Sequence, residues 1–300
     1  MSSLKRRIKY GLAKMLAFVP TPIMLCLQYL IKTRRVLHLS NPQRFTEKVQ
    51  WYKAFYRNEN MLKCTDKYLV RDFCRERLGT EKYLNSLYQV CDDAKDIDFE
   101  KLPDSFVIKT TDGGNGDNVY ICHNKQLLDK SHVVNLVNSW RNKKYDIISR
   151  EWAYEGARNS QIIVEKLLVD PDNEDGSIDD YKFLCYDGVF RFLWVDKGRY
   201  VNHRRGFWDR DLNFLYNVSS DHPTFDEPPT LPQNISEMIT VAEQLSTGFP
   251  FARVDLYNIK GDIIFGEITF YPWSGYVKYS PDSFDYTLAQ YFKTYEGERN

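Results

Sequence analysis

The chain lacks the patterns that identify a disulfide framework, a zinc site or a membrane span. Its six cysteines are scattered and form no Cys-x-x-Cys pair, which indicates reduced thiols in a cytoplasmic protein. The apolar stretch over residues 12–30 is interrupted by Lys14, Pro20 and Pro22. It therefore predicts neither a secretory signal nor a spanning helix.

The chain also lacks an excess of charge and a nucleophilic triad. Lys plus Arg and Asp plus Glu both number 41 among 300 residues, so no global charge indicates nucleic acid as a partner. The five histidines are not clustered, and no Ser-His-Asp or Cys-His arrangement is evident. A hydrophobic content of 43% is enough for a large core, which predicts an enzyme of one large or two small domains.

The N-terminal stretch is flanked by basic residues, Lys5-Arg6-Arg7 before it and Arg34-Arg35 after it. Its prolines predict two short helices, the second capped by Thr21. Such helices can dock on their own domain, which we favour, or lie on an anionic membrane surface. The second interpretation would bring the protein to the inner face of the membrane as a peripheral contact.

Two alternating segments, 251–257 and 263–270, predict a β-hairpin near the C-terminus. A three-residue connection, 259–261, would place Arg253 opposite Glu267 and Asp255 diagonal to Glu267. Thr269 joins these three on one face. The other face is apolar and carries Ala252, Val254, Leu256, Ile264, Ile268 and Phe270.

The polar face of this hairpin can be a site for a metal and a phosphate. Two carboxylates a few ångströms apart repel each other unless a cation lies between them. Mg²⁺ prefers a few hard oxygen ligands together with substrate phosphate oxygens, and an Arg can hold a phosphate bidentately. The alternative is a surface ladder in which Arg253 pairs with Glu267 and nothing binds.

Residues 106–122 predict a strand, a glycine-rich turn and a second strand. Gly113, Gly114 and Gly116 could let backbone N–H groups close over an anion, and Lys109 would add a positive charge beside them. No Gly-Lys-Ser/Thr follows and no third glycine opens a helix, so this is neither a Walker loop nor a dinucleotide fingerprint. Taken alone, the segment is better explained as a plain hairpin tip.

Other charged residues recur at the ends of predicted elements. Lys67 lies on a helix expected over 66–79, Glu165 near the end of a strand over 161–169, and Asp180 and Lys182 on one later strand. The order of these charged residues resembles that of the ATP-grasp superfamily. The motif sequences themselves resemble the TupA-like branch of that superfamily, which is found in bacterial capsule, O-antigen and teichuronopeptide gene clusters. The resemblance covers roughly residues 37–292. The motifs that carry it are Asn41-Pro42, Phe45, Glu47-Lys48, Asp66-Lys67-Tyr68, Leu102-Pro103, Phe106–Lys109, Val164-Glu165, Asp180–Lys182, Arg253–Tyr257 and Gly266–Phe270.

The resemblance implies an α+β ATP-grasp fold, with two α+β lobes around a nucleotide cleft. A helical N-terminal region would span residues 1–60. The N-terminal lobe with the glycine-rich loop would span 61–160, and the C-terminal lobe with the metal site would span 161–295. Where many relatives carry a separate substrate-binding domain before the lobes, this chain has only a short helical region.

The same resemblance implies ATP and Mg²⁺ as ligands and assigns roles to individual residues. Lys67 and Lys109 would contact phosphates, Gly113, Gly114 and Gly116 would close over them, Glu165 with the backbone of Lys166 to Leu168 would border the adenine, and Asp180 would hold the ribose. Lys182 would reach toward phosphate or acceptor, Arg253 would steady an acyl phosphate, and Asp255 and Glu267 would hold Mg²⁺. Thr269 stands where many relatives have an Asn, and its hydroxyl is a weaker metal ligand.

The activity implied is that of a carboxylate–amine ligase of surface polysaccharide synthesis, working through an acyl phosphate. The alternatives are a glycosyltransferase or sugar kinase on the same fold, or a non-catalytic ATP-binding scaffold. The substrate would be a small molecule or a glycan, free or lipid-linked. Candidate acceptor residues cluster within 194–222, and this basic stretch can equally be a solvated loop. Its members are Lys197, Arg199, His203, Arg204, Arg205, Trp208, Asp209 and Arg210.

Overall fold

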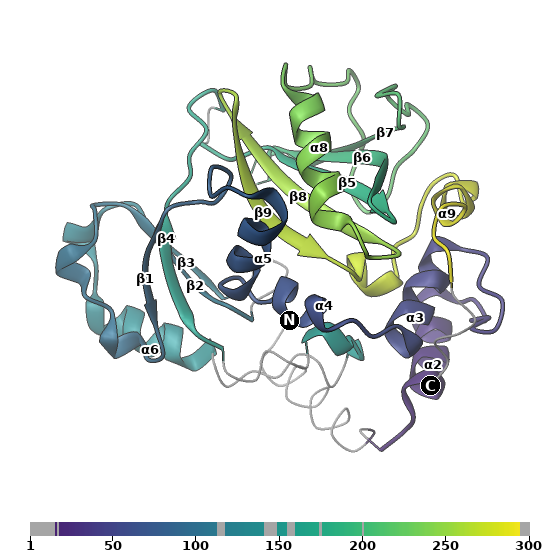
Figure 1. Cartoon of the computed structure of the whole chain (residues 1–300), viewed down its shortest axis with the longest axis horizontal. Helices are drawn as coiled ribbons and strands as arrows, with labels where there is room; N and C mark the ends of the chain where they lie inside the picture. Colours follow the sequence, from purple (N-terminus) through teal and green to yellow (C-terminus); the bar gives the residue numbers. More distant parts are fainter. Residues whose placement is uncertain are drawn as a thin grey trace.

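The computed structural model describes residues 16, 18–112, 118–140, 149–154, 160–173, 176–199 and 201–294. Within these residues the strands form a four-stranded and a five-stranded sheet, both antiparallel, with helices around them (Figure 1). This arrangement confirms the expected α+β class. All six cysteines lie in the described residues and are free thiols, as their spacing predicted.

The four-stranded sheet has the order β1-β4-β2-β3. Its strands are β1 (Leu87–Cys91), β2 (Phe106–Thr110), β3 (Val119–Cys122) and β4 (Ile162–Lys166). Helix α6 (Lys130–Trp140) buries Val133, Val137 and Trp140, which recur at i, i+4 and i+7 and so share one face. These side chains form a small core with apolar residues of β2 and β4.

The five-stranded sheet has the order β7-β6-β5-β8-β9. Its strands are β5 (Asp180–Tyr186), β6 (Val189–Lys197), β7 (Arg204–Trp208), β8 (Ala252–Ile259) and β9 (Asp262–Thr269). All 7 residues of the central strand β5 are buried. Helix α8 (Ile235–Ser246) lies across β8, β5 and β6 (Figure 1) and buries Met238, Val241, Ala242 and Leu245 against them. The other face of the sheet carries both polar side chains, among them Lys182, and large apolar ones such as Trp194 and Phe207.

Strand β4 belongs to the four-stranded sheet because it pairs with β1 and β2. The sequence interpretation placed residues 162–166 in the C-terminal lobe, 161–295. In the structure the chain passes from the first sheet to the second between Lys166 and Asp180. The division into domains otherwise stays a prediction.

The β8–β9 hairpin differs from its expected register. The connection is the two residues Lys260-Gly261, both with positive φ, 53° and 93°. The turn pairs Leu256 with Phe265, and one extra residue on β9, Gly266, then places Asp255 opposite Glu267 and Arg253 opposite Thr269. A bulge at Gly266 shifts the register, so that Phe265 and not Ile264 joins the buried side. A Cβ on Gly266 would lie 3.0 Å from the Asp255 carbonyl oxygen, which explains a glycine there.

Four helices precede the first sheet: α2 (Thr21–Thr33), α3 (Phe45–Phe55), α4 (Glu59–Thr65) and α5 (Leu69–Leu78). Helix α2 confirms the second expected N-terminal helix, but its N-cap residue is Pro20 and Thr21 lies inside it. Most of the first expected helix falls outside the described residues. Among those described, no helix is long and apolar enough to cross a membrane.

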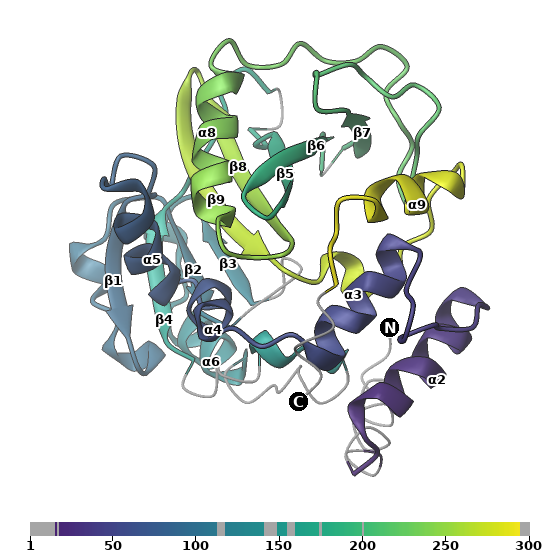
Figure 2. The ribbon, with the colours of Figure 1, turned by 45° about the vertical axis from the view of Figure 1, so that its right-hand side comes forward.

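Helix α3 packs against two segments of the C-terminal part of the chain. It packs against the 3-10 turn η5 (Pro272–Gly275) and against α9 (Ser283–Ala289), as Figure 2 shows. The Thr46 backbone N–H donates to Asp285 Oδ1 at 3.0 Å, and the Thr46 hydroxyl donates to Oδ2 at 2.8 Å. Lys48 Nζ donates to the carbonyl oxygens of Ala289 and Phe292 at 2.9 and 2.6 Å.

Lys53, also on α3, is a fully buried cation. Its ammonium group donates to the Ser274 carbonyl at 2.8 Å and lies 3.4 Å from Glu151 Oε1. Burial lowers the pKa of Lys53 to about 8, although the charge of Glu151 opposes this. Folding therefore forces Lys53 into an environment that favours its neutral form.

We expect the stability of the protein to rise with pH relative to a Lys53→Met variant. In the unfolded chain Lys53 keeps its proton up to about pH 10.5, whereas in the folded chain it releases the proton near pH 8. The unfolded state binds more protons between these values, so the free energy of unfolding should gain about 3 kcal/mol across this window. Urea unfolding of both proteins from pH 7.5 to 10 measures the difference. An unchanged difference over that range would contradict the burial argument.

Candidate active site

A cleft of about 800 Å³ lies between the two sheets and collects most of the predicted site residues. Predicted residues that line it are Lys67, Lys109, Glu165, Leu168, Asp180, Lys182, Arg253, Asp255 and Glu267. Lys166 and Thr269 are described but are not among its lining residues. Gly113, Gly114 and Gly116 lie outside the described residues, so their proposed closure over phosphates stays a prediction.

Arg253 is the centre of the polar face of the β8–β9 hairpin. Its guanidinium donates to both carboxylate oxygens of Asp255, each at 2.7 Å, and to Glu267 Oε1 at 2.7 Å. The Thr269 hydroxyl accepts from Arg253 at 2.9 Å and donates to Glu267 at 2.7 Å. Arg253 and Asp255 are buried, whereas the Glu267 side chain is 45% exposed. Glu267 is thus the carboxylate more open to the cleft.

Lys182 connects this group to the neighbouring strands. It lies opposite Asp255 across the β5–β8 pair, and its Nζ donates to Asp255 Oδ2 at 3.0 Å. It also pairs with Asp180 on its own strand, and Arg199 donates to Asp180 Oδ2 at 2.9 Å. The Oδ1 atom of Asp180 is buried and has no hydrogen-bond partner among the described residues. A ligand hydroxyl could satisfy this oxygen.

The two facing carboxylates differ in their proton affinity. Burial raises the pKa of Asp255 to about 6, against the lowering effect of Arg253 and Lys182. Burial also acts on Glu267, but Arg253, Lys182 and Lys67 outweigh it and lower the pKa of Glu267 to about 2. Glu267 is therefore ionised at neutral pH.

The donor set on this hairpin fits magnesium. In the described part of the chain no three His, Cys, Asp or Glu side chains cluster closely enough to hold a metal ion. Mg²⁺ commonly uses only one or two carboxylates and completes its octahedron with water and substrate phosphate. Asp255 and Glu267, directly opposite each other and both at the cleft, would be such a pair, although Asp255 also accepts from Arg253 and Lys182.

The first sheet contributes cationic groups to the opposite wall of the cleft. Lys109 Nζ, from β2, donates to Glu165 Oε2 on β4 at 3.0 Å. Lys67 is not on a helix as expected, because the Asp66 carboxylate accepts from the backbone N–H groups of residues 68 and 69 and α5 begins only at Leu69. From this turn, the Lys67 backbone N–H donates at 3.0 Å to the carbonyl of Thr111, which precedes the glycine-rich segment. Burial lowers the pKa of Lys67, and Glu267 opposes that effect.

Two residues of the cleft were missed by the sequence interpretation. Arg71, on α5, donates to Glu165 Oε1 at 3.3 Å, and the available signal was a second basic residue four positions after Lys67. Asp196 on β6 lies opposite Asp180 and accepts from Trp194, Arg205 and, in one tautomer, His203. Burial is outweighed by Arg205 and Lys182, which hold the pKa of Asp196 well below its usual range. Its signal was the one acid of a strand that is otherwise apolar apart from Arg191 and Lys197.

The basic stretch after Trp194 is largely neutralised by acids. Arg199, His203 and Arg205 line the cleft, but they contact Asp180 or Asp196. Outside the cleft lining, Lys197 pairs with Asp179 and Arg204 with Asp226, and Trp208 is buried. A role for this stretch in binding an acceptor stays a prediction.

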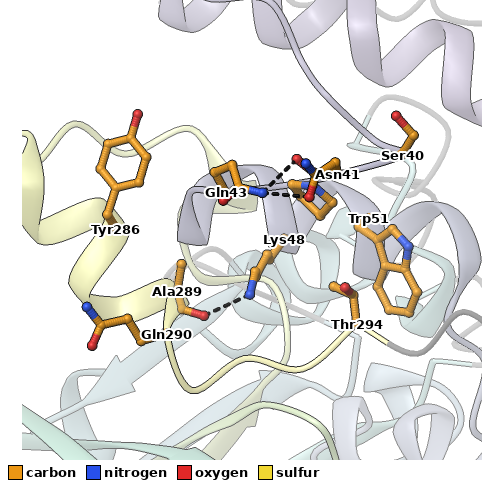
Figure 3. A pocket seen from close by; sticks show the side chains of 10 residues that line it. Ser40, Asn41, Gln43, Lys48, Trp51, Tyr286, Ala289, Gln290 and Thr294 are labelled. Carbon is orange, nitrogen blue, oxygen red and sulfur yellow. Dashed lines mark hydrogen bonds between the residues drawn. The ribbon is translucent and has the colours of Figure 1, made fainter.

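A second cavity of about 410 Å³ lies where α3 meets α9 (Figure 3). Asn41, Pro42 and Lys48, which carry part of the family resemblance, line it together with Trp51 and Gln290. Lys48 reaches across it to the Ala289 carbonyl oxygen (Figure 3). This cavity shares no lining residue with the cleft. These motif residues therefore lie outside the cleft, and Lys48 connects α3 to α9.

The sequence and the fold were compared with those of known proteins. No curated protein matches the sequence. Among solved structures, D-alanine–D-alanine ligase from Bacillus anthracis is 17% identical, with 69% of this chain and 57% of that chain covered and a TM-score of 0.40. L-amino acid ligase from Bacillus licheniformis is 14% identical, with 76% and 46% covered and a TM-score of 0.41. The chain spans about half the length of these two proteins.

A family model gives a more extensive match. The model described as TupA-like ATP-grasp matches residues 47–293, which include both sheets and the whole cleft. The match confirms the resemblance of the sequence to the ATP-grasp superfamily and, with it, the expected fold. The chain belongs to the TupA-like ATP-grasp family.

Proposed function

We propose that the protein is a Mg-ATP-dependent carboxylate–amine ligase of bacterial surface polysaccharide synthesis. The observation that carries this proposal is the pair Asp255 and Glu267, directly opposite each other and joined by Arg253, facing a cleft whose other wall carries Lys67 and Lys109. Phosphoryl transfer requires positioning and charge neutralisation more than a protein nucleophile. The cleft offers both.

The reaction proposed has two balanced steps. A substrate carboxylate oxygen attacks the γ-phosphorus of ATP, and the bond to the β–γ bridging oxygen breaks to release ADP. An amine then attacks the carbonyl carbon of the acyl phosphate, the bond from that carbon to the phosphate oxygen breaks, and inorganic phosphate leaves with the proton that the amine loses as the amide forms. Arg253 would steady the acyl phosphate, and Lys182 would contact phosphate or acceptor. A magnesium ion held by Asp255 and Glu267 would neutralise charge on the phosphate oxygens.

The nucleotide would lie in the cleft between the two sheets. Lys67 and Lys109 would contact its phosphates, with the segment containing Gly113, Gly114 and Gly116 above them. Glu165 with Lys166 and Leu168 would border the adenine. The unsatisfied Oδ1 of Asp180 supports a contact to a ribose hydroxyl. The carboxylate substrate would be a small molecule or a sugar acid of a glycan.

A glycosyltransferase is supported less well. The nearest approach to a donor-sugar metal motif, Asp209-Arg210-Asp211, lies in a turn after β7. There the Asp209 carboxylate accepts from the backbone N–H groups of Asp211 and Asn213 at 3.0 and 2.9 Å. Asp209 therefore stabilises its own turn and is not among the residues lining the cleft.

Nucleotide binding is the first test. With Mg-ATP at a hundredfold excess over its dissociation constant, the protein should gain about 2.7 kcal/mol of stability in a thermal-shift measurement. Lys109→Met should weaken this response, while Lys95→Met, an exposed lysine outside the cleft, should not. A folded protein that no nucleotide stabilises would contradict the proposal.

The second test separates a ligase from a glycosyltransferase. Incubation with ATP, magnesium, candidate sugar acids and hydroxylamine should trap the activated carboxylate as a hydroxamate, with one ADP released for each product. Asp209→Ala should behave as the wild type. Sugar transfer from a UDP- or GDP-sugar without ATP, lost in Asp209→Ala and retained in Glu267→Gln, would overturn the ligase assignment.

A further inference from the structure

Helix α2 has an apolar outer face that no other part of the described chain covers. Its inner face packs Leu25 and Tyr29 into a small core with Leu37. The outer face consists of Ile23, Leu27, Leu30 and Ile31, which are 55%, 50%, 47% and 66% exposed. These positions recur at i, i+4, i+7 and i+8 and so share one side of the helix. Both ribbon views place α2 at the edge of the molecule (Figures 1 and 2).

The sequence around α2 is strongly asymmetric in charge. Residues 1–46 contain no Asp or Glu, and the first acidic residue is Glu47. The same segment carries nine basic residues, Lys5, Arg6, Arg7, Lys9, Lys14, Lys32, Arg34, Arg35 and Arg44. The whole chain is neutral, so the rest of it holds the compensating excess of acid. Five of the basic residues lie in the segment before α2, outside the described residues. Of the other four, Arg34 is exposed, Arg35 and Arg44 pair with Asp282, and Lys32 lies over the ring of Tyr276.

We propose that the outer face of α2 docks on an anionic lipid bilayer. Ile23, Leu27, Leu30 and Ile31 would lie at the boundary between headgroups and acyl chains, with Arg34 near the lipid phosphates, and the positive charge of the sequence around the helix would attract the anionic surface. An apolar stripe combined with basic flanks is what interfacial binding requires, since each contribution alone gives weak attachment. A second copy of the chain or a protein partner could cover the stripe, but neither would account for 46 residues without an acid. The inference is independent of the chemistry in the cleft.

Co-sedimentation with vesicles tests the proposal. The full chain is incubated with vesicles of phosphatidylcholine alone and with vesicles containing phosphatidylglycerol, at 0.1 and 0.5 M salt. The wild type should bind the anionic vesicles and release them at high salt. The double variant Leu27→Glu/Ile31→Glu should bind about tenfold or more weakly. The matched control is Leu127→Glu/Val201→Glu, which adds the same two charges at exposed apolar positions elsewhere and should bind as the wild type.

Three results would overturn the proposal: a wild type that does not bind anionic vesicles, a Leu27→Glu/Ile31→Glu variant that binds as well as the wild type, or a control that loses binding equally. A dimer that the α2 variant converts to a monomer, without vesicle binding by the wild type, would instead assign the face to a second copy. Circular dichroism establishes that each variant is folded. Failure here leaves the ATP-binding tests unaffected, because no outer-face residue lines the cleft.

Discussion

Replacing Glu267 by Gln is expected to lower ATP-dependent turnover about 1,000-fold or more while the protein stays folded. The substitution keeps the shape of the side chain and removes the charge that would hold magnesium and balance Arg253. The Gln amide oxygen can still accept from Arg253 and Thr269, so the protein should stay folded although it loses the charge that balances Arg253. Steady-state release of ADP and thermal unfolding, measured on the same preparation, give the two quantities.

Asp262→Asn is the matched control for this variant. Asp262 is an exposed acid at the start of the same strand, β9, and it does not line the cleft. Its loss removes the same charge from the same hairpin without touching the carboxylate pair. Turnover by Glu267→Gln comparable with that of Asp262→Asn would contradict the role given to Glu267.

The adjacent residue should respond in the opposite way. Ile268 is 2% exposed on the apolar side of the hairpin and lies opposite Val254. Ile268→Asp would bury an unpaired carboxylate, and we expect a loss of more than about 4 kcal/mol, enough to unfold much of the population. Circular dichroism and urea unfolding measure the effect.

Ile268→Val provides the comparison, since it removes one methylene group and should cost about 1 kcal/mol. A folded Ile268→Asp together with an unfolded Glu267→Gln would mean that the strand faces the other way. The two neighbouring positions thus test the register of the hairpin, because a one-residue slip exchanges its two faces.

The alternation of apolar and polar residues predicted the two faces of this hairpin but not its register. Successive side chains of a strand point to opposite faces, so an alternation of apolar and polar residues in the sequence shows directly which side chains are buried. The register depends on the conformations of Lys260 and Gly261 and on the bulge at Gly266, which are decided by backbone geometry and by close packing on Asp255. The expected three-residue turn was wrong for that reason.

Contacts between strands distant in sequence were also beyond the sequence alone. Lys182 was expected to face phosphate or acceptor, and in the structure it lies among Asp180, Asp196 and Asp255 on three neighbouring strands. The order of the motifs identified the family, and the family resemblance in turn named most of the residues that line the cleft. It contained no information about Asp196, whose importance arises only when β6 pairs with β5.

The join between α3 and α9 has a consequence for how the protein is made. Thr46 and Asp285 are 239 residues apart, so a ribosome working at 5 to 20 residues per second needs about 10 to 50 s to deliver the partner of Thr46. During that interval Phe45 and Tyr52 lack the ring of Phe292 against which they pack. The nascent chain therefore carries an unfinished aromatic surface until Phe292 emerges, and a premature stop before that residue would leave the surface exposed permanently.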